Sequence, residues 1–471
     1  MRGDGWRRAV LACALAFVSS FAPAMARAAG DGLSAATWHV PEPDPLDFTG
    51  ADEAGFWTAG GERIGLDGKR DLKLRVPPGP PNEVDNAATV PGPKGPVFAE
   101  GIRDGARRGL FVGAYDQKGE NVWALRLLGE TRAGAIEGPD GLFPGEAGDA
   151  LLAGKLSGCF RFAPDAKPIC ADERALARNF DCEGGCDGQP FVTRIDARGN
   201  VAWVLAPPGY PATHFSASRD GPVAWGGDFK GQLDLDPDPH HTVLVAAPHA
   251  RRPGSGPSQA FWALFDARRE MRWLSGWAIV GPASASLRAE SFSSDSTLIV
   301  VSDVNGPRRN EEPDLLTDGT TTTPLPPFGP SGTVVIMVGP SQSMPVIELL
   351  TKHSYPSTLA LRLLASRTND VFASFGDLPA RPDEDRPGPP HPDRTVLAVY
   401  GAAKGWRIRV PNDVEPTAVV VRNGKACFAF TFSGPHDLSV RGRIVRVGGT
   451  QADTSTAIGC YDLKLDTRQS P

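Results

Sequence analysis

The segment with the clearest chemical character is LDLDPDPHH, residues 233–241. Asp234, Asp236 and Asp238 alternate along it as carboxylates do in a calcium-binding loop, where oxygen ligands surround the cation. The glycine and the distal glutamate of an EF-hand are absent, and two prolines stiffen the segment. Two hypotheses follow: a calcium site on these three carboxylates, and a plain surface turn, which the pattern favours. The adjacent histidines are a weaker transition-metal candidate, and no other cofactor is indicated.

The cysteines predict disulfide bonds. Four of them fall between Cys159 and Cys186, with spacings of 11, 12 and 4 residues and no CxxC pair, which favours disulfides over a zinc site. We expect these four to pair among themselves and Cys427 to pair with Cys460. An even number of cysteines fits an oxidising compartment. The six that lie beyond the N-terminal leader are Cys159, Cys170, Cys182, Cys186, Cys427 and Cys460.

The leader itself, residues 1–28, predicts a cleaved signal peptide. Arginines at positions 7 and 8 precede an apolar run from Ala9 to Phe21, and an Ala-x-Ala pattern follows. A membrane anchor is disfavoured, because Pro23 and Arg27 interrupt the run and about 20 apolar residues are needed to span a bilayer. We therefore expect a secreted, periplasmic or cell-surface protein with no transmembrane span after cleavage.

No catalytic signature stands out. GxSxG, HExxH and P-loop patterns are absent, and the eight histidines show no spacing typical of a triad. The sequence therefore predicts no catalytic and no cofactor-binding residue, and it leaves open whether the protein is an enzyme. The net charge of −6 comes from 49 basic and 55 acidic residues without a basic stripe, so nucleic acid is not an expected partner.

The elements that must position these residues are short strands. With 54 glycines and 45 prolines, the composition favours β structure with many turns over long helices. The stretch FVTRIDARGNVAW, residues 191–203, recurs without gaps at 111–123 and 261–273, with Phe first, Asp sixth and Trp thirteenth. Residues 461–466 match the start of the same unit. A repeated unit is the economical interpretation.

Each copy is followed by a second recurring block, in which two apolar strands flank a tight turn. Asp220-Gly221 and Asn423-Gly424 are dipeptides that supply positive φ in a two-residue hairpin. Four antiparallel strands per unit describe a blade of a β-propeller. We therefore predict an all-β, β-propeller-like fold with about five to six four-stranded blades and long loops.

The predicted organisation has three parts. The signal peptide covers residues 1–28, an extended N-terminal segment with a Pro-rich linker covers 29–94, and the propeller-like domain covers 95–471. Because the chain stops on the first strand of a unit, a partner strand from near 97–102 or from 30–75 is expected to close the ring.

Within the unit, the side chains indicate packing. Phe191 and Ile195 share one face of a strand, and Trp203 on the next strand is expected to cover the same interior. Asp196 begins the turn, where its carboxylate can accept backbone N–H bonds. These positions are therefore predicted to be structural.

The unit resembles the secreted bacterial β-propeller repeats of the SBBP type, strongest over residues 111–306. The resemblance implies a secreted or surface repeat protein, and the family offers no shared catalytic residues. The matching positions are Phe191, Val192, Asp196, Gly199, Trp203, Gly227, Phe229 and Gly231.

The preferred functional hypothesis is a binding or interaction module whose ligand, a protein or a carbohydrate, contacts the loops of one propeller face. The alternative is a secreted polysaccharide hydrolase or lyase with carboxylates in the central channel. A third hypothesis is a calcium-dependent adhesin that uses Asp234, Asp236 and Asp238.

Overall fold

The computed structural model describes residues 37–463 apart from short internal segments. The predicted signal peptide therefore lies outside the described residues. The internal segments left out are 41–45, 47, 53, 77–86, 93, 105–106, 130–134, 146–147, 164, 173–187, 208–209, 219–220, 237–239, 247–255, 268–271, 283, 293–295, 306–312, 326–330, 340–344, 354–361, 366–370, 377–393, 401–406, 412–413, 441–442 and 448–453.

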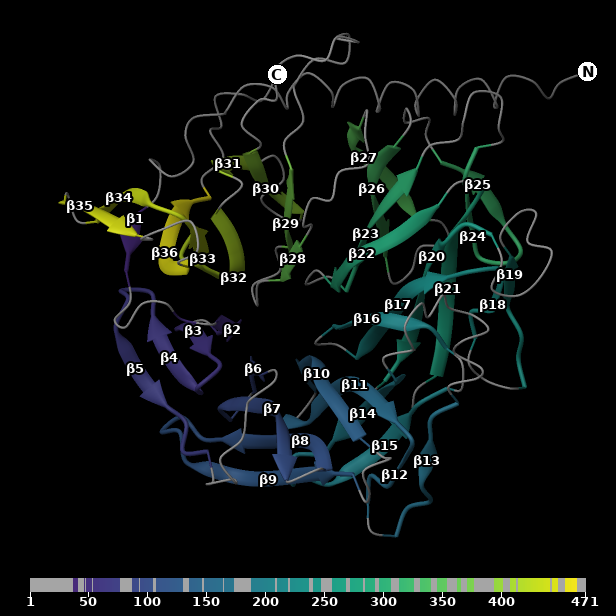
Figure 1. The fold of residues 1–471 in the computed structure, drawn as a ribbon, viewed down its shortest axis with the longest axis horizontal. Coiled ribbons are helices and arrows are strands. Elements are labelled where there is room, and N and C mark those ends of the chain that lie inside the picture. The colour runs from purple at the N-terminus through teal and green to yellow at the C-terminus, as the bar shows by residue number, and fades with distance from the viewer. Residues whose placement is uncertain are drawn as a thin grey trace, which may run out of the picture.

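Seven sheets of at least four strands stand side by side around a ring in the described part of the chain (Figure 1). We number them as blades 1 to 7, with their strands given from the centre outward. Blade 1 contains β2 (Phe48–Ala51), β3 (Gly55–Thr58), β4 (Glu62–Gly65) and β5 (Arg70–Lys73). Blade 2 contains β6 (Ala87–Pro91), β7 (Pro96–Asp104), β8 (Arg107–Tyr115) and β9 (Asn121–Leu128). Blade 3 contains β10 (Ala135–Pro144), β11 (Ala150–Ser157), β14 (Gln189–Ile195) and β15 (Val201–Leu205).

The second half of the ring repeats this order. Blade 4 contains β16 (Ala212–Ala217), β17 (Pro222–Phe229), β20 (Gln259–Asp266) and β21 (Arg272–Val280). Blade 5 contains β22 (Ala285–Phe292), β23 (Leu298–Asn305), β26 (Ser331–Val338) and β27 (Val346–His353). Blade 6 contains β28 (Arg362–Ala365), β29 (Val371–Gly376), β30 (Arg394–Tyr400) and β31 (Arg407–Pro411). Blade 7 contains β32 (Val414–Arg422), β33 (Lys425–Ser433), β36 (Thr454–Asp462) and β1 (Thr37–His39).

The predicted all-β propeller with four-stranded blades is confirmed. The innermost strands contact one another in the order β2, β6, β10, β16, β22, β28, β32 and then β2 again, which closes the ring. The sheet topology gives seven blades where five to six were expected, because residues 48–73 form a complete blade instead of an extended segment. The propeller therefore begins before residue 95, and the expected boundary between 29–94 and 95–471 is corrected. No helix among the described residues has the length and apolar character needed to cross a membrane.

The ring is closed by a strand from near the N-terminus, as predicted. β1 pairs antiparallel with β36, so a strand from the 30–75 region supplies the outer strand of blade 7. The Cys427–Cys460 disulfide, which was predicted, joins β33 to β36 in the same blade. Lys425 and Pro222 each follow the turn that begins the second strand of a blade. Lys425 pairs with Asp462 just as Pro222 pairs with Asp266. Asp462 therefore takes the repeated Asp position, and the expected repeat start at 461–466 is wrong by four residues.

The repeated Asp turn is confirmed where the structure describes it. The Asp196 carboxylate accepts the N–H groups of Arg198 at 2.8 Å and Asn200 at 2.9 Å. Asp116 does the same with the N–H groups of residues 118 and 120. Slight burial raises the pKa of Asp196, but these N–H donors outweigh it and hold the pKa below its usual value. Asn423 and Gly424 have φ values of 53° and 71°, as a two-residue hairpin turn requires.

The Gly of the repeated turn fits against the Trp of the preceding blade. Gly199 has a φ of 85°, and a Cβ added there would lie 3.0 Å from Cε3 and 3.1 Å from Cδ2 of Trp123. Trp203 of blade 3 likewise packs in one cluster with Ala267, which follows Asp266 of blade 4. In blades 2 and 3 the repeated Trp therefore contacts the region of the Asp turn in the next blade.

The expected side of Trp203 is wrong, and a one-residue bulge explains why. Trp203 pairs with Arg194, and the bulge residue Ala202 directly precedes Trp203 in the chain. Trp203 therefore faces away from Phe191 and Ile195, which lie in the core between blades 2 and 3. In blade 4 the bulge follows the Trp instead, so Trp273 pairs with Phe265 and their ring centroids are 5.7 Å apart. A shift of one residue moves a strand side chain to the other face.

Substitution of Gly199 by alanine is expected to destabilise the protein more than substitution of Gly424. Both residues have positive φ, so either alanine costs about 1–2 kcal/mol of backbone strain. Only Gly199 also meets a side chain, whereas nothing lies within 4 Å of a Cβ at Gly424. Urea denaturation should show an additional loss of about 1–3 kcal/mol for Gly199→Ala. Equal losses for the two variants would contradict the proposed contact with Trp123.

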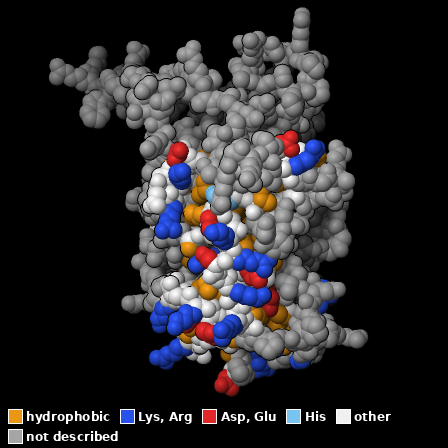
Figure 2. Space-filling model, turned by 90° about the vertical axis from the view of Figure 1, so that its left-hand side faces the viewer, with side chains coloured by type: hydrophobic (Ala, Val, Ile, Leu, Met, Phe, Trp, Pro, Cys, Tyr) orange, Lys and Arg blue, Asp and Glu red, His pale blue; other side chains and the backbone are white. Residues whose placement is uncertain are grey.

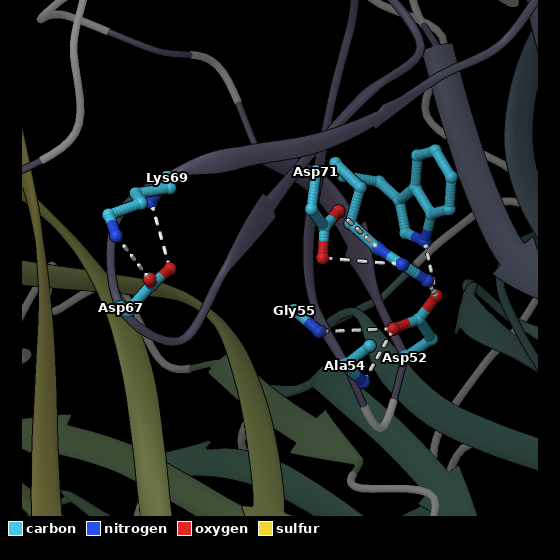
Figure 3. A network of polar contacts seen from close by, with 8 residues as sticks. Asp52, Ala54, Gly55, Asp67, Lys69 and Asp71 are labelled. Atoms are coloured by element: carbon cyan, nitrogen blue, oxygen red, sulfur yellow. Dashed lines mark hydrogen bonds and ion pairs between the residues drawn. The ribbon is translucent and has the colours of Figure 1, made fainter.

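Blade 1 is held by a polar network that spans its strands (Figure 3). Asp52 accepts the N–H groups of Ala54 and Gly55, and its second oxygen accepts Nε1 of Trp57 at 3.0 Å. Arg63 bridges Asp52 to Asp71 on β5. These hydrogen bonds and ion pairs give the polar groups of the segment their partners, which explains how it forms a blade without the repeat signature.

The side of the ring that carries β5 presents interspersed basic and acidic side chains (Figure 2). Arg70, Asp71 and Lys73 are the exposed residues of β5, the outermost strand of blade 1. Charged residues on an edge strand disfavour pairing with another chain.

Candidate functional site

Four inserted hairpins mark one face of the propeller. They are β12–β13 (Cys159–Phe160, Ile169–Cys170), β18–β19 (Gln232–Asp234, Leu244–Ala246), β24–β25 (Leu315–Thr317, Thr322–Pro324) and β34–β35 (His436–Val440, Arg443–Val447). In chain order each is inserted between the second and third strand of one blade. β24–β25, inserted in blade 5, pairs with β21 at the outer edge of blade 4. Because antiparallel strands alternate in direction, all connections of this kind leave the same face. We call it the hairpin face, and its hairpins lie around the outer rim in Figure 1.

Two of the three predicted calcium ligands lie on this face. Asp234 accepts the N–H groups of Asp236 at 3.2 Å and Val243 at 2.8 Å, which closes the β18–β19 hairpin. The buried Asp236 carboxylate bonds to Nδ1 of the exposed His241 at 2.5 Å. Asp238 lies outside the described residues, and among those described no group of three His, Cys, Asp or Glu side chains is placed to hold a metal. Calcium binding stays a prediction, and a melting temperature unchanged by chelator would remove it.

The Cys159–Cys170 disulfide joins the two strands of another inserted hairpin. This agrees with the predicted pairing among the four clustered cysteines. Cys182 and Cys186 lie outside the described residues.

A bulge recurs at one position of the innermost strands. In the pairs β2–β3, β16–β17, β22–β23 and β32–β33, a single extra residue interrupts the register, namely Thr49, Thr213, Arg288 and Thr417 respectively. β10 carries a larger interruption at the same level. Bulges redirect side chains and are frequent next to binding and active sites.

At this level, blades 4 and 5 bring titratable side chains together, and we call their shared interface the 4/5 seam. Asp228, one residue before the end of β17, reaches across it to blade 5. Its carboxylate accepts Oγ–H of Ser286 and N–H of Leu287, both at 2.7 Å. β17 leads directly to the β18–β19 hairpin, so this end of the seam lies toward the hairpin face.

Two further charged or ionisable groups flank Asp228. The half-buried imidazole of His214, on β16, hydrogen-bonds to the backbone carbonyl of Leu287. Arg288, the exposed bulge residue of β22, donates from Nε to Asp303 at 2.7 Å. The seam cluster of His214, Asp228, Ser286 and Arg288 thus combines acceptors and donors that are half-buried or exposed.

Glu290 lies beneath this cluster without a hydrogen-bond partner. Its residue is 8% exposed, and both carboxyl oxygens are buried and unpaired. A Cβ added to Gly226 would lie 2.8 Å from Oε2 of Glu290, so the absence of a side chain there makes room for the carboxyl group. Gly226 and Asp228 are two residues apart on the same face of β17, about 7 Å along the strand. Glu290 of β22 therefore reaches β17 one side-chain position away from Asp228.

Burial sets the protonation of these groups. Burial raises the pKa of Asp228 to about 6, although the Leu287 N–H, Ser286 and Arg288 oppose the shift. Burial alone raises the pKa of Glu290 well above its usual value and so favours the neutral carboxyl group. Burial, with Arg288 and Lys155 nearby, lowers the pKa of His214 and favours the neutral imidazole. Asp228 is therefore mostly ionised at pH 7, whereas burial favours the neutral forms of Glu290 and His214.

Asp228→Asn is expected to remove a pH dependence of stability. The native protein binds the Asp228 proton more tightly than the unfolded chain, so its contribution is full below about pH 4 and is lost as pH rises through about 6. The two-unit shift corresponds to about 3 kcal/mol. Chemical denaturation at pH 4 and pH 7 should therefore show the wild type losing most of that amount, about 2–3 kcal/mol, relative to the variant. Asp196→Asn, whose carboxylate has a lowered pKa, should show the opposite sign, and a parallel pH profile for Asp228→Asn would refute the assignment.

No part of this cluster was predicted from the sequence. His214 and Asp228 belong to the recurring hairpin block, but Ser286 and Glu290 come from the next blade. The available signal was Gly226-Gly227 within an apolar strand, since glycine in a strand interior often marks a bulge or a close approach.

Comparison with known proteins adds no family. No protein-family model matches the chain, and no curated protein matches it. The polysaccharide lyase Uly1 aligns with 94% of this chain and 95% of its own, at 9% identity and a TM-score of 0.40. An ulvan lyase of a family titled PL25 aligns with 91% and 96%, at 8% identity and a TM-score of 0.37. The Dos1 propeller aligns with 82% and 83%, at 11% identity and a TM-score of 0.32.

Proposed function

We propose that this chain is an exported β-propeller that binds carbohydrate on its hairpin face without cleaving it. The observation that carries the proposal is that all four inserted hairpins of the described chain leave the same face. Loops held by a rigid scaffold are the usual location of binding residues. The seam cluster lies at the same end of the strands and contributes hydrogen-bonding groups toward the centre of that face.

The chemistry of the surface favours a hydroxyl-rich ligand over a protein partner. Large apolar side chains that are strongly exposed in the described part of the chain are isolated: Val122, Leu244, Leu274 and Val346, of which only Leu244 belongs to an inserted hairpin. Protein interfaces are usually centred on a contiguous apolar patch. Histidine, carboxylate, guanidinium and hydroxyl groups instead suit the hydroxyls of a sugar.

Export is part of the proposal. Two disulfide bonds fit an oxidising compartment, as does the signal-like composition of residues 1–28. The resemblance to SBBP-type repeats, which implies a secreted or surface protein, points the same way.

Affinity electrophoresis separates this proposal from its rivals. The purified mature protein would be run through native gels that contain galactomannan, mixed-linkage β-glucan, arabinoxylan, polygalacturonate or alginate. The same polymers would be assayed for new reducing ends and for absorbance of unsaturated uronates. We expect retardation by at least one polymer, no cleavage, and loss of retardation when residues 232–246 and 436–447 are each replaced by an Asn-Gly turn. Cleavage would support the hydrolase or lyase alternative, and no retardation by any polymer would reject carbohydrate binding.

A further inference from the structure

We infer that the 4/5 seam is a subsite for adjacent hydroxyl groups of an uncharged sugar residue, with Asp228 as the principal acceptor. The inference rests on the proposed carbohydrate binding and adds the location of the subsite and the charge class of its ligand. It starts from four side chains that share one end of the seam: His214, Asp228, Ser286 and Arg288.

The subsite has acceptors to spare. An ionised carboxylate offers about four lone-pair positions. Asp228 uses one on each oxygen, for Ser286 Oγ–H and for Leu287 N–H. The neutral imidazole of His214 donates one ring N–H to the Leu287 carbonyl, which leaves its second nitrogen as an acceptor. Asp228 is held by the N–H group of Leu287, and His214 is held by the carbonyl group of the same residue. These two acceptors suit two neighbouring O–H donors.

The balance of charge selects an uncharged ligand. Arg288 is paired with Asp303, and Lys155 is the other cation close enough to act on His214. Arg288 is also the cation that acts on Asp228, so it serves the carboxylates of both Asp228 and Asp303. An acidic sugar would place a further negative charge beside Asp228 and find Arg288 already engaged, which costs binding energy.

Glu290 is the second observation that points to a ligand. A buried polar group without a partner costs about 1–3 kcal/mol, and each such group in a native protein calls for an explanation. The carboxyl group of Glu290 makes no hydrogen bond that would offset this cost. The neighbouring Gly226 lies in a strand interior, where a Cβ would lie 2.5 Å from Cδ2 of Leu287. Glu290 thus places a buried carboxyl group, whose pKa burial raises, against Gly226 beneath the subsite.

Asp228→Asn is the decisive variant, measured in the neutral galactomannan, β-glucan and arabinoxylan gels at pH 5 and pH 7.5. Wild type should bind at least one of these polymers about tenfold more tightly at pH 7.5 than at pH 5, because binding needs the ionised carboxylate. Asp228→Asn should bind at least tenfold more weakly than wild type at pH 7.5 and lose the pH dependence. Asp196→Asn, whose turn lies on the opposite face, is the matched control and should bind as wild type does.

His214→Gln provides a second variant if Asp228→Asn proves too unstable, and it should also weaken binding. Wild-type affinity in Asp228→Asn and His214→Gln, together with loss of binding in the hairpin replacements, would overturn the subsite and leave the proposed function intact. Tighter retardation by polygalacturonate or alginate than by the neutral polymers would overturn the charge class. Loss of all retardation in wild type would reject both.

Discussion

Trp38→Ala is expected to lower the free energy of unfolding by about 3–5 kcal/mol, the usual cost of truncating a fully buried large aromatic side chain. Trp38 is 1% exposed and lies on β1, the strand that closes the ring. Its ring centroid lies 5.5 Å from Phe430, 5.8 Å from Phe432 and 6.5 Å from Tyr461. Alanine would leave a cavity among these rings and loosen the only strand of blade 7 that comes from the N-terminal part of the described chain.

Guanidinium denaturation followed by tryptophan fluorescence and circular dichroism measures this loss. Trp38→Phe keeps an aromatic ring in the same place and should cost markedly less, which makes it the matched control. If Trp38→Ala unfolds at the wild-type denaturant concentration, β1 does not close the ring, and the pairing of blade 7 would need revision.

Removal of the second closure device should cost about 2–4 kcal/mol. The paired substitution Cys427→Ser with Cys460→Ser deletes the disulfide between β33 and β36, whose cysteines are 33 residues apart in sequence. The inserted β34–β35 hairpin lies within the loop that the disulfide closes. Without the disulfide, the unfolded chain gains the conformational entropy of this loop.

The matched control is Cys159→Ser with Cys170→Ser, which opens a shorter loop of separation 11 in a peripheral hairpin. It should cost less, and it should leave β1 and β36 protected from hydrogen exchange. Since Trp38 lies over the same blade, its effect and that of the Cys427–Cys460 disulfide are expected to be non-additive. Equal losses from the two disulfides, with strict additivity to Trp38→Ala, would contradict a shared closure.

The repeat was enough to predict the blade but not the count of blades. Asp196 and Gly199 mark a turn whose geometry depends on local backbone bonds, and the structure confirms it. Blade 1 lacks the signature. Asp52 stabilises its first turn, and Arg63 links Asp52 to Asp71 through contacts that no spacing rule describes. Its identification needed three-dimensional pairing.

Register explains the other misses. Whether Trp203 and Trp273 face one core or the next depends on a bulge one residue before or after them, and the sequences around both are similar. The seam cluster joins Asp228 of one blade to Ser286 and Leu287 of the next, so it follows from the packing of blades and not from either repeat alone. The alternating spacing of Asp234 and Asp236 suggested metal ligands, but both carboxylates accept hydrogen bonds within their own hairpin.

The most direct test of the central claim, carbohydrate binding on the hairpin face at the 4/5 seam, is hydrogen–deuterium exchange of the wild-type protein with and without the neutral polymer that retards it most. We predict slower exchange in residues 212–217, 285–292 and the β18–β19 hairpin, with the turns at 116–120, 196–200 and 423–424 on the opposite face unchanged. Slower exchange confined to those turns, or no change in either set, would contradict the claim.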